Sequence, residues 1–398
     1  MAEAVIVSAV RTPIGRANKG VLKDVRADDL AAIAVRGAVE RVPQLDRSLI
    51  EDVILGCAFP EGEQGMNLAR LVGALAGLPE TAGGVTVNRF CASSLQAFNM
   101  AAQNIMLDLG DVFIAGGVES MSRVPMGGFN PSFNPRLIKT DGDEQANSLY
   151  PPCELEYAYS SYIPMGMTAE NLVRKYQIGR EAQDAFALRS HQRALAAIDN
   201  GIFKREIVPV PLPDGRVMEV DEGPRRDTSL ERLASLEPAF IKGGTVTAGN
   251  SSPLNDGASA VVLMSAERAR DLGITPLAKV HSMAVAGVDP AFMGVGPVPA
   301  MRKLFGRSHK QVSDIDIIEL NEAFAVQNLS VIRELGIDEE KLNPHGGAIA
   351  LGHPLGCSGA RLIATLLNDL QTLDKTWGIA TLCVGGGQGV ATLIERLS

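Results

Sequence analysis

The same succession of local patterns occurs twice along this chain of 398 residues. Each time, an elbow with a reactive side chain, Cys91 in one case and His353 in the other, leads into a helical pattern. A strand pattern follows each helix, and paired glycines follow each strand, at 116–117 and at 385–386. Strands that alternate with helices are typical of layered α/β proteins. We therefore expect two similar α/β halves whose elbows meet at the interface between them, where ligand sites are common.

Hydrophobic periodicity and turn residues give the expected elements. Buried strands are expected at 4–10, 52–59, 85–87, 112–115, 260–264, 277–285, 316–320 and 379–382. Helices are expected from an N-cap at Asp28 or Asp29 to Pro43, near 67–76, after Cys91, before Gly179, before Gly201, up to Leu335 and after Ser358.

Between residues 121 and 249 the alternation weakens and Pro, Asn, Met and Tyr become common. The run Pro213-Asp214-Gly215 is typical of a hairpin turn. We interpret 121–249 as an inserted loop domain that covers one end of the first half. The expected organisation is a first half at 1–120, completed by 250–272, then this insertion, then a second half at 273–398.

Charge and cysteine content narrow the function classes. The formal net charge is −9 and no basic run of five occurs, which argues against nucleic acid and anionic membranes as partners. Five cysteines without a C-x-x-C pair fit a reducing compartment. The N-terminus shows no secretory pattern, and no apolar run approaches the ~20 residues that span a bilayer. The expected location is the cytoplasm.

The stretch 345–359 has the character of an active-site loop, because it holds two of the five histidines and five glycines. Glycine permits close backbone approach and positive φ. Pro354 biases His353 away from helical angles, and apolar residues at helical spacing follow Ser358. We expect the His353 imidazole on a rigid elbow just before a helix.

Two cysteines are candidate partners of this histidine. Cys91 follows a short β-rich run and precedes a helix, so the partial positive charge of the helix N-terminus is expected to lower its pKa and favour thiolate. Cys383 ends an apolar strand that runs into glycines, where backbone N–H groups are free to donate.

Other interpretations of these residues are weaker. Cys91 could be a small buried hydrophobic residue, since free cysteine is often buried. Zinc ligation is disfavoured and no metal is expected, because no tight Cys/His pair anchors a site; its ligands would be His345, His353, Cys357 and Cys383. The glycines at 385–387 fit neither a P-loop nor G-x-G-x-x-G. Asn321 is expected to cap the helix that follows it.

Several blocks, in order over the full length, resemble the thiolase family. They are 88–97 around Cys91, Asn321-Glu322-Ala323-Phe324, the 345–359 loop and 383–389, supported by 11–15, 117–122 and 248–258. The resemblance implies a five-layered αβαβα fold of two similar halves plus a loop domain over the coenzyme A site. It also implies a homodimer or a homotetramer, and an acyltransferase that uses coenzyme A as co-substrate and keeps no permanently bound cofactor.

The implied transferase activity is that of an acetyl-CoA C-acyltransferase. CoA cleaves a 3-oxoacyl-CoA into acetyl-CoA and a shortened acyl-CoA, and the reverse is a Claisen condensation. Such a reaction needs a nucleophile for the ketone carbon, a proton donor for the enolate and donors for two oxyanions. The resemblance assigns these roles in turn. Cys91 is the nucleophile, His353 takes its proton, and Cys383 protonates the enolate and later deprotonates the incoming CoA thiol.

The remaining site residues are likewise implied by the resemblance. One oxyanion hole is His353 with a water held by Asn321, and the other is the backbone N–H of Cys91 and of Gly385. Met165 and Phe324 map onto the wall of the acyl pocket. Arg225, Ser252, Phe240 and Ala248 map onto the groove for the nucleotide and pantetheine parts of CoA.

The chain departs from many short-chain biosynthetic members in one place. They carry a histidine before the Met-Gly of the loop domain, where this chain has Ile163-Pro164-Met165. We therefore favour a degradative 3-ketoacyl-CoA thiolase of fatty acid β-oxidation, hence of lipid metabolism, over an acetoacetyl-CoA thiolase (acetyl-CoA C-acetyltransferase).

Two further rivals belong to other classes. A decarboxylating ketosynthase usually has histidine in place of Cys383. A non-catalytic CoA-thioester binder should have lost Cys91, His353 or Cys383, and all three are present. A multienzyme β-oxidation partner fits the reaction, although no residue points to one.

Overall fold

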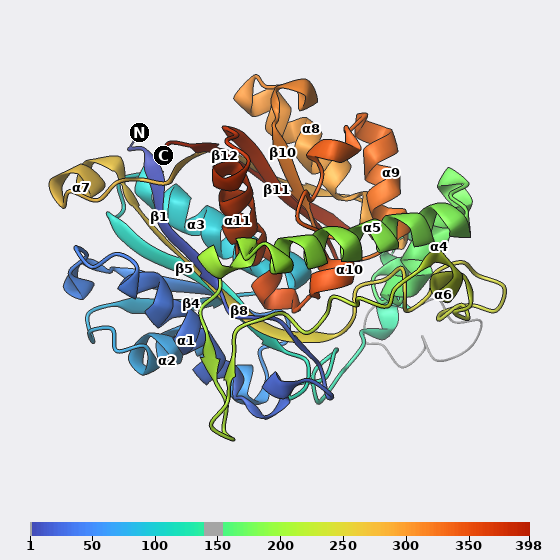
Figure 1. Cartoon of the computed structure of the whole chain (residues 1–398), viewed down its shortest axis with the longest axis horizontal. Helices are drawn as coiled ribbons and strands as arrows, with labels where there is room; N and C mark the ends of the chain where they lie inside the picture. Colours follow the sequence, from blue (N-terminus) through green and yellow to red (C-terminus); the bar gives the residue numbers. More distant parts are fainter. Residues whose placement is uncertain (1, 139–153) are drawn as a thin grey trace.

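The computed structural model describes residues 2–138 and 154–398 (Figure 1). The strands are β1 (Ala4–Arg11), β2 (Gly15–Arg16), β3 (Asp52–Gly56), β4 (Gly83–Val87), β5 (Val112–Ser120), β6 (Val210–Pro211), β7 (Val217–Met218), β8 (Asn255–Ser265), β9 (Ala278–Gly287), β10 (Ile317–Leu320), β11 (Trp377–Val384) and β12 (Gln388–Arg396). The α-helices are α1 (Ala27–Glu40), α2 (Leu68–Leu75), α3 (Ser93–Met106), α4 (Met165–Tyr176), α5 (Arg180–Asp199), α6 (Leu230–Ala234), α7 (Ala266–Asp271), α8 (Pro297–Ser308), α9 (Ala325–Leu335), α10 (Ala348–Leu351) and α11 (Leu355–Thr372). Cys153 lies outside the described residues.

The two halves share one strand order. The sheet runs β10-β11-β12-β9-β1-β8-β5-β3-β4. In each half the last strand, β8 or β12, lies antiparallel between the first strand and the penultimate one. In each half the penultimate strand pairs in parallel with an earlier one, β5 with β3 and β11 with β10. Where β4 pairs in parallel with β3, the second half has a single parallel bridge from Ile318 to Leu342. This agreement is what a duplicated unit would produce.

The hydrophobic cores show five layers. Alternate residues of β5 and β8 point to opposite faces, as strand geometry requires. Val262 packs with α1 and α2, whereas Leu263 packs with α3 and α11. The other side of α3 and α11 meets the second half, and the outer face of that half packs on α8 and α9. In Figure 1 the pair α3 and α11 lies between α1/α2 and α8/α9. The predicted αβαβα arrangement is thus confirmed.

The two halves of the sheet are joined at their first strands. β1 pairs antiparallel with β9 over a short ladder, Val5 with Lys279 and Ile6 with Ala278. The seam lies at the centre of the strand order, between the two halves. An antiparallel pair of equivalent strands is the arrangement that a twofold relation between the halves requires.

Several predicted boundaries are wrong, each for a local reason. The first helix begins at Ala27 after Arg26 and ends at Glu40, so Asp28 lies in its first turn and does not cap it. The strand predicted to stop before Gly116 continues to Ser120, because β8 pairs along its whole length. A Cβ on Gly116 would lie 2.2 Å from the Ser259 carbonyl oxygen, so glycine there permits the close strand approach.

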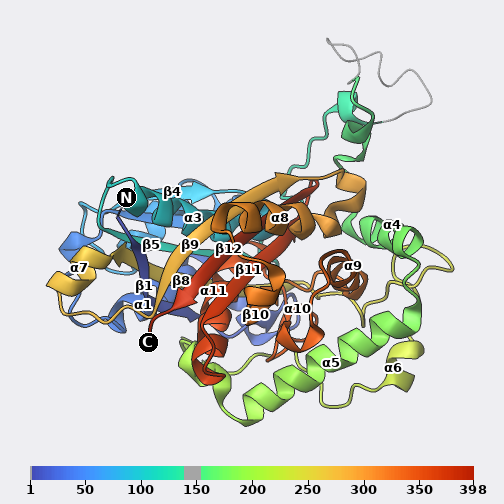
Figure 2. The ribbon, with the colours of Figure 1, turned by 90° about the horizontal axis from the view of Figure 1, so that it is seen from above.

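The insertion lies against both halves, and not only at one end of the first as predicted. Its hairpin β6–β7 has the expected turn, with the Leu212 N–H donating to the Arg216 carbonyl, and Val210 packs in the core beneath α1. Its helices α4 and α5 instead pack on α9 and α10 of the second half, with Leu172 and Phe186 in that core. Figure 2 shows α4, α5 and α6 flanking the second half.

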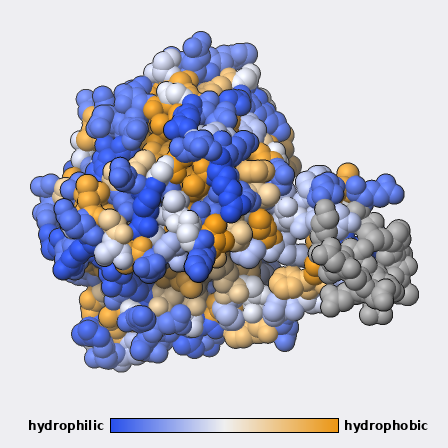
Figure 3. Space-filling view, turned by 90° about the vertical axis from the view of Figure 1, so that its right-hand side faces the viewer, coloured by the Kyte–Doolittle hydropathy of each residue, from blue (hydrophilic) through white to orange (hydrophobic). Residues whose placement is uncertain are grey.

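Figure 3 views the side of the molecule on which these helices lie, and shows hydrophobic residues exposed among hydrophilic ones over its centre. Within the part of the chain that the structure describes, every helix is too short or too polar to cross a membrane.

Candidate active site

Cys91 lies on an elbow with unusual backbone geometry. It is the middle residue of a one-turn 3₁₀ helix, η4 (Phe90–Ala92), between β4 and α3. Phe90 has φ +42°, which is uncommon for a large side chain. Asn88 holds this conformation, since its Oδ1 accepts from the Phe90 N–H at 2.8 Å and its Nδ2 donates to the Ala58 carbonyl at 2.9 Å. Such strained positions cluster at functional sites, where the surrounding structure maintains them.

The electrostatics of Cys91 differ from the prediction. Burial raises the pKa of the thiol to about 11, against the opposing effect of the Gly385 N–H and its own N–H. The nearby carboxyl of Glu119 raises the pKa further. The predicted net lowering by the helix N-terminus is therefore wrong, because desolvation outweighs the backbone donors. At that pKa Cys91 is a thiol at neutral pH, so a nucleophilic role would need a base.

Cys383 shares this site. It lies near the end of β11, fully buried, and burial followed by the neighbouring Cys91 raises the pKa of its thiol well above its usual range. The turn from β11 to β12 uses Gly386 and Gly387, whose φ values of +76° and +78° favour glycine. This turn leaves the Gly385 N–H facing the Cys91 sulfur.

His353 lies on the expected elbow, between α10 and α11. Gly352 before it has φ +112°, and a Cβ there would lie 2.6 Å from the side chain of Asn255. Asn255 Oδ1 in turn accepts from the His353 N–H at 2.9 Å. The backbone of the histidine is thus fixed on both sides.

The hydrogen bonds of the imidazole define its tautomer. Ser358 Oγ donates to the Pro354 carbonyl at 2.8 Å, so it accepts from His353 Nδ1 at 2.6 Å. Nδ1 therefore carries the proton, and Nε2 presents a lone pair 3.3 Å from Asn321 Nδ2. Burial, and then the charge of Arg361, lower the pKa of His353 to about 3. The ring is neutral and can accept a proton at Nε2.

Asn321 does not cap a helix, contrary to the prediction. The helix after it, α9, begins at Ala325 with Phe324 as its N-cap, and the Asn321 amide is fully buried between His353 and Arg361. Glu322 beside it is also buried and accepts from Ser190 Oγ at 2.6 Å. The side chain of Asn321 is thus available to the site.

The two elbows meet, as predicted from the repeat. α11 packs against both η4 and α3, so the start of the helix after His353 lies beside the turn with Cys91. Glu119 links the His353 elbow to the segment after β3, because its carboxylate accepts from the backbone N–H of Gly356 and of Ala58, both at 2.8 Å. The Ala58 carbonyl in turn accepts from Asn88, at the Cys91 elbow. Burial raises the pKa of Glu119.

Three predicted substrate residues form one apolar wall. Met165 begins α4, and its sulfur lies 3.7 Å from the position of a Cβ on Gly385. The rings of Phe240 and Phe324 meet edge to face with centroids 6.1 Å apart. Phe240 also packs on Gly166, where a Cβ would lie 2.1 Å from its ring. Met165, Phe240 and Phe324 therefore lie on the side of the site that borders the insertion.

A cavity of about 560 Å³ is lined by Arg225 and Ala248. Met165, Phe240 and Phe324 do not line it, but Ser251, which does, forms an isolated β-bridge with Phe324. Ser252 lies between two lining residues, Ser251 and Pro253. Four basic side chains line the cavity, Arg16, Lys19, Arg225 and Arg232, with one acidic side chain, Asp227, which pairs with Arg232. This basic character suits a polyanionic ligand despite the acidic chain as a whole.

Several of these residues were not found from the sequence. His191 lines the cavity and accepts at Nδ1 from the Arg225 N–H at 3.2 Å, and burial lowers its pKa to about 4. Glu119 and Arg361 are buried charges, and the only signal for them was a charge within an otherwise apolar strand or helix. The sequence did not indicate Arg16, Lys19 and Arg232, because no local pattern shows that they line one cavity.

Of the four residues considered as zinc ligands, the two histidines make other contacts. His345 Nδ1 lies 2.5 Å from Asp369 Oδ1, whereas His353 bonds Ser358. In residues 2–138 and 154–398, no group of three or more His, Cys, Asp or Glu side chains is placed to hold a metal ion.

Comparisons with known proteins cover the whole chain. The family models for the thiolase N-terminal domain and the thiolase C-terminal domain match residues 4–267 and 274–396. The 3-ketoacyl-CoA thiolase of Bacillus subtilis is 49% identical over 407 residues, covering 99% of this chain and 100% of that protein. The protein of the same name from Shewanella denitrificans is 50% identical over 408 residues, covering 100% of both chains.

Solved structures agree in fold. The crystal structure of Bacillus anthracis acetyl-CoA acetyltransferase has a TM-score of 0.89 at 43% identity, covering 100% of this chain and 99% of that one. The crystal structure of human mitochondrial 3-ketoacyl-CoA thiolase in complex with CoA has a TM-score of 0.88 at 38% identity, covering 100% and 98%.

Proposed function

This chain belongs to the thiolase family, and from that premise we propose that it is a 3-ketoacyl-CoA thiolase whose two cysteines and one histidine perform CoA-dependent cleavage of 3-oxoacyl-CoA. The observation that carries the residue assignment is that the Cys91 sulfur faces the Gly385 N–H and lies close enough to Cys383 to raise its pKa. Two thiols and a neutral imidazole from three distant segments are what the reaction needs.

The first step forms a carbon–sulfur bond. The Cys91 thiol gives its proton to His353 Nε2 as its sulfur attacks C3 of the substrate, so a strongly basic free thiolate is never required. The ketone oxygen becomes an oxyanion. The Cys91 and Gly385 N–H groups, which face the sulfur, are the donors for an oxyanion on the carbon that the sulfur binds.

The second step breaks the bond between C2 and C3. Its electron pair moves to the departing acetyl-CoA as an enolate, and the Cys383 thiol protonates that carbon. The raised pKa of Cys383 keeps it protonated until the enolate forms. The protonated His353 Nε2 and a water on Asn321 Nδ2 donate to the enolate oxygen, and the Cys91 acyl-enzyme remains.

The third step releases the product. The Cys383 thiolate deprotonates the CoA thiol, whose sulfur attacks the acyl-enzyme carbonyl. The carbon–sulfur bond to Cys91 breaks, and Cys91 recovers its proton from His353. Both cysteines and the histidine return to their starting states, so no permanent cofactor is needed and CoA is a co-substrate.

The substrate groove follows from the same assignment. We propose that the basic cavity holds the phosphates of CoA, with Arg225, Ala248 and Ser252 along it. The wall of Met165, Phe240 and Phe324 then borders the pantetheine and acyl parts. The insertion at 121–249 supplies most of this groove, with 1–120 plus 250–272 and 273–398 as the two halves.

A second candidate is an acetoacetyl-CoA thiolase, because two similar solved structures carry the name acetyl-CoA acetyltransferase at 43% and 42% identity. A chain-length profile of thiolysis separates the two. We expect CoA-dependent loss of 3-oxoacyl-CoA substrates from C4 to medium chain length, with acetyl-CoA and an acyl-CoA two carbons shorter as products. Activity confined to the C4 substrate would favour the second candidate. Malonyl-dependent condensation without thiolysis would instead indicate a ketosynthase.

We also propose a homodimer or homotetramer. β4 stands at one end of the strand order, and apolar side chains near it are exposed: Met66, Leu71, Leu75, Val85 and Phe90. An exposed edge strand with apolar neighbours is suited to pairing with another chain. Light scattering should give a mass of two or four chains. We propose further that the protein acts in the cytoplasm, in fatty acid β-oxidation. A multienzyme partner would supply its 3-oxoacyl-CoA substrate.

A further inference from the structure

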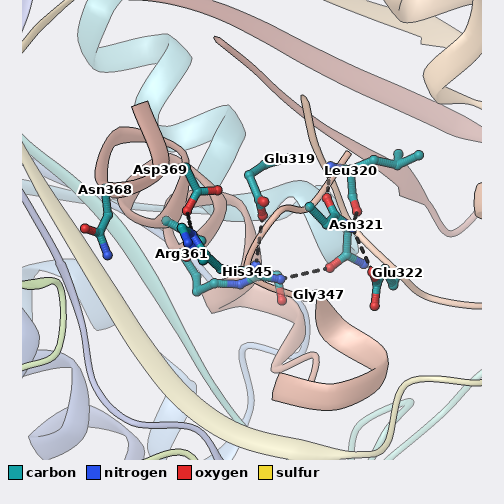
Figure 4. Close-up of polar contacts among 12 residues, drawn as sticks. Glu319, Leu320, Asn321, Glu322, His345, Gly347, Arg361, Asn368 and Asp369 are labelled. Atoms are coloured by element: carbon teal, nitrogen blue, oxygen red, sulfur yellow. Dashed lines mark hydrogen bonds and ion pairs between the residues drawn. The ribbon is translucent and has the colours of Figure 1, made fainter. Parts of the chain in front are cut away.

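Behind Asn321 and His353 lies a buried cluster of charged groups. Its centre is Arg361 on α11, with Glu319 on β10 and Asp369 further along α11, and all three side chains are fully buried. In Figure 4 these three residues lie on the same side of Asn321 as His345. Burying charged groups in a core is costly unless they are paired and hydrogen-bonded.

Arg361 fixes which way the Asn321 amide points. Arg361 Nη2 lies 3.4 Å from Asn321 Oδ1. A guanidinium donates only, so the amide oxygen must face it and the amide nitrogen must face His353 Nε2. The reversed amide would set NH₂ against guanidinium and oxygen against the imidazole lone pair. Two unfavourable contacts would replace two favourable ones.

Arg361 is itself held from behind. Its Nη1 lies 3.5 Å from Glu319 Oε2, an ion pair and not a hydrogen bond, since Nη1 and Nε of Arg361 have no hydrogen-bond partner. Both carboxyl oxygens of Glu319 and Oδ2 of Asp369 are buried without a hydrogen-bond donor. One proton shared between the two carboxyls satisfies an oxygen of each, and burial raises the pKa of both groups. His345 Nδ1 completes the cluster, 2.5 Å from Asp369 Oδ1.

We propose that Arg361 is a positioning residue for this reaction, which holds the Asn321 amide with its N–H groups toward the catalytic imidazole. It touches neither substrate nor the sulfurs and acts through Asn321 and, by its charge, through His353. The expected effect of Arg361 on turnover rests on the proposed function. Its expected effect on the pKa of His353 does not depend on that function.

The charged groups around Arg361 and His353 determine in which direction the pKa of His353 changes when Arg361 is replaced. The groups facing Arg361 and His353 are Glu319, Glu322, Asp369, Cys357 and, across Asp369, Glu206 and His345. Arg361 is the cation among them that lowers the pKa of His353. Loss of its charge should therefore raise the pKa of His353 from about 3 toward its ordinary value.

The test compares Arg361→Gln and Arg361→Lys with Arg11→Gln. Arg11 is an equally buried arginine that contacts neither Asn321 nor His353 and pairs with Glu206 and Asp221. Because Glu206 lies across Asp369 from Arg361, Arg11→Gln controls both for loss of a buried charge and for a change within the carboxyl cluster. We expect Arg361→Gln to lower kcat by about 10²-fold while the KM for CoA changes little, as for a displaced oxyanion-hole donor. Arg361→Lys keeps the charge but cannot reach Asn321 and Glu319 together, so kcat should recover only in part.

A second readout is independent of turnover. Nitrogen NMR of the labelled histidines reports the tautomer and pKa of His353, and the chain has only five histidines to assign. We expect a higher His353 pKa in Arg361→Gln and the native value in Arg361→Lys and Arg11→Gln. Equal kcat and equal His353 titration in Arg361→Gln and Arg11→Gln would overturn the inference. Absence of thiolysis in the native protein would instead overturn the proposed function, while the titration would still report on Arg361.

Discussion

Gly359 on α11 lies so close to α3 that a Cβ on it would be 2.2 Å from the backbone nitrogen of Leu95. These two helices follow the two elbows, and their contact sets the distance between Cys91 on one and His353 on the other. A backbone atom cannot move aside as a side chain can. Glycine at position 359 is therefore required for α3 and α11 to pack closely enough to bring Cys91 and His353 into one site.

We expect Gly359→Ala to lower the free energy of unfolding by about 1–3 kcal/mol, although alanine favours helices, because the helices must separate. Turnover should fall as well, since the elbows move apart. Gly306→Ala on α8 is the matched control, because nothing lies near its Cβ position, and it should be stabilising by about 0.5–1 kcal/mol. Urea unfolding of both variants measures this. Similar midpoints would mean that the close contact does not constrain the fold.

Cys91→Ser should abolish the acyl-enzyme, because a hydroxyl is far less acidic than a thiol and a neutral imidazole cannot activate it equally well. Incubation with an acyl-CoA followed by intact-protein mass spectrometry reads the added acyl group directly. Cys357→Ser serves as control, since Cys357 is a buried thiol outside the proposed steps. An acyl adduct retained in Cys91→Ser would move the nucleophile to another residue.

Cys383→Ala should separate the two halves of the reaction. Acylation of Cys91 from a simple acyl-CoA forms no enolate, so it should persist. Carbon–carbon cleavage needs the proton donor and should fall by about 10²–10⁴-fold. Steady-state thiolysis gives the rate of carbon–carbon cleavage, and intact-protein mass spectrometry of the same preparation gives the extent of Cys91 acylation. Thiolysis near the native rate would remove Cys383 from the mechanism.

Acid should destabilise the protein partly through His353. Its folded pKa of about 3 lies below the unfolded value of 6.5, so between these values the unfolded chain binds a proton that the folded one does not. The contribution of His353 to the free energy of unfolding is therefore fully present above pH 6.5. It decreases by about 1.4 kcal/mol per pH unit as the pH falls from 6.5 toward 3. His353→Gln removes the titration, so its stability should fall less steeply with acid. Parallel curves for the two proteins would show that His353 titrates normally.

Arg225→Ala should raise the KM for CoA several-fold and leave kcat close to native, because Arg225 lines the basic cavity away from the thiols. The effect should shrink at high salt, which screens exposed charges. Arg226→Ala is the neighbouring control, since Arg226 pairs with Asp199 and does not line the cavity. Equal KM values in the two variants would place the CoA phosphates elsewhere.

The sequence by itself determined the repeated α/β plan, most strands and helices, and the elbows at Cys91 and His353. These follow from local rules: periodicity reports which face is buried, and glycine and proline restrict the backbone over a few residues. The errors in the elements include boundaries, such as the strand that runs through Gly116 because its partner β8 continues. They also include two elements that the sequence did not predict, helix α8 and strand β12.

Only the tertiary structure decided the state of the reactive groups. The pKa of Cys91 depends on how much water the whole fold removes, which outweighed the local helix N-terminus. Asn321 was expected both to cap its own helix and, by the resemblance, to lie at an oxyanion hole with His353. The structure shows no cap, and the contact of its amide with Arg361, forty residues away in sequence, had no local signal. Desolvation and long-range contacts sum over segments that share no local pattern, so neither could be read from the chain.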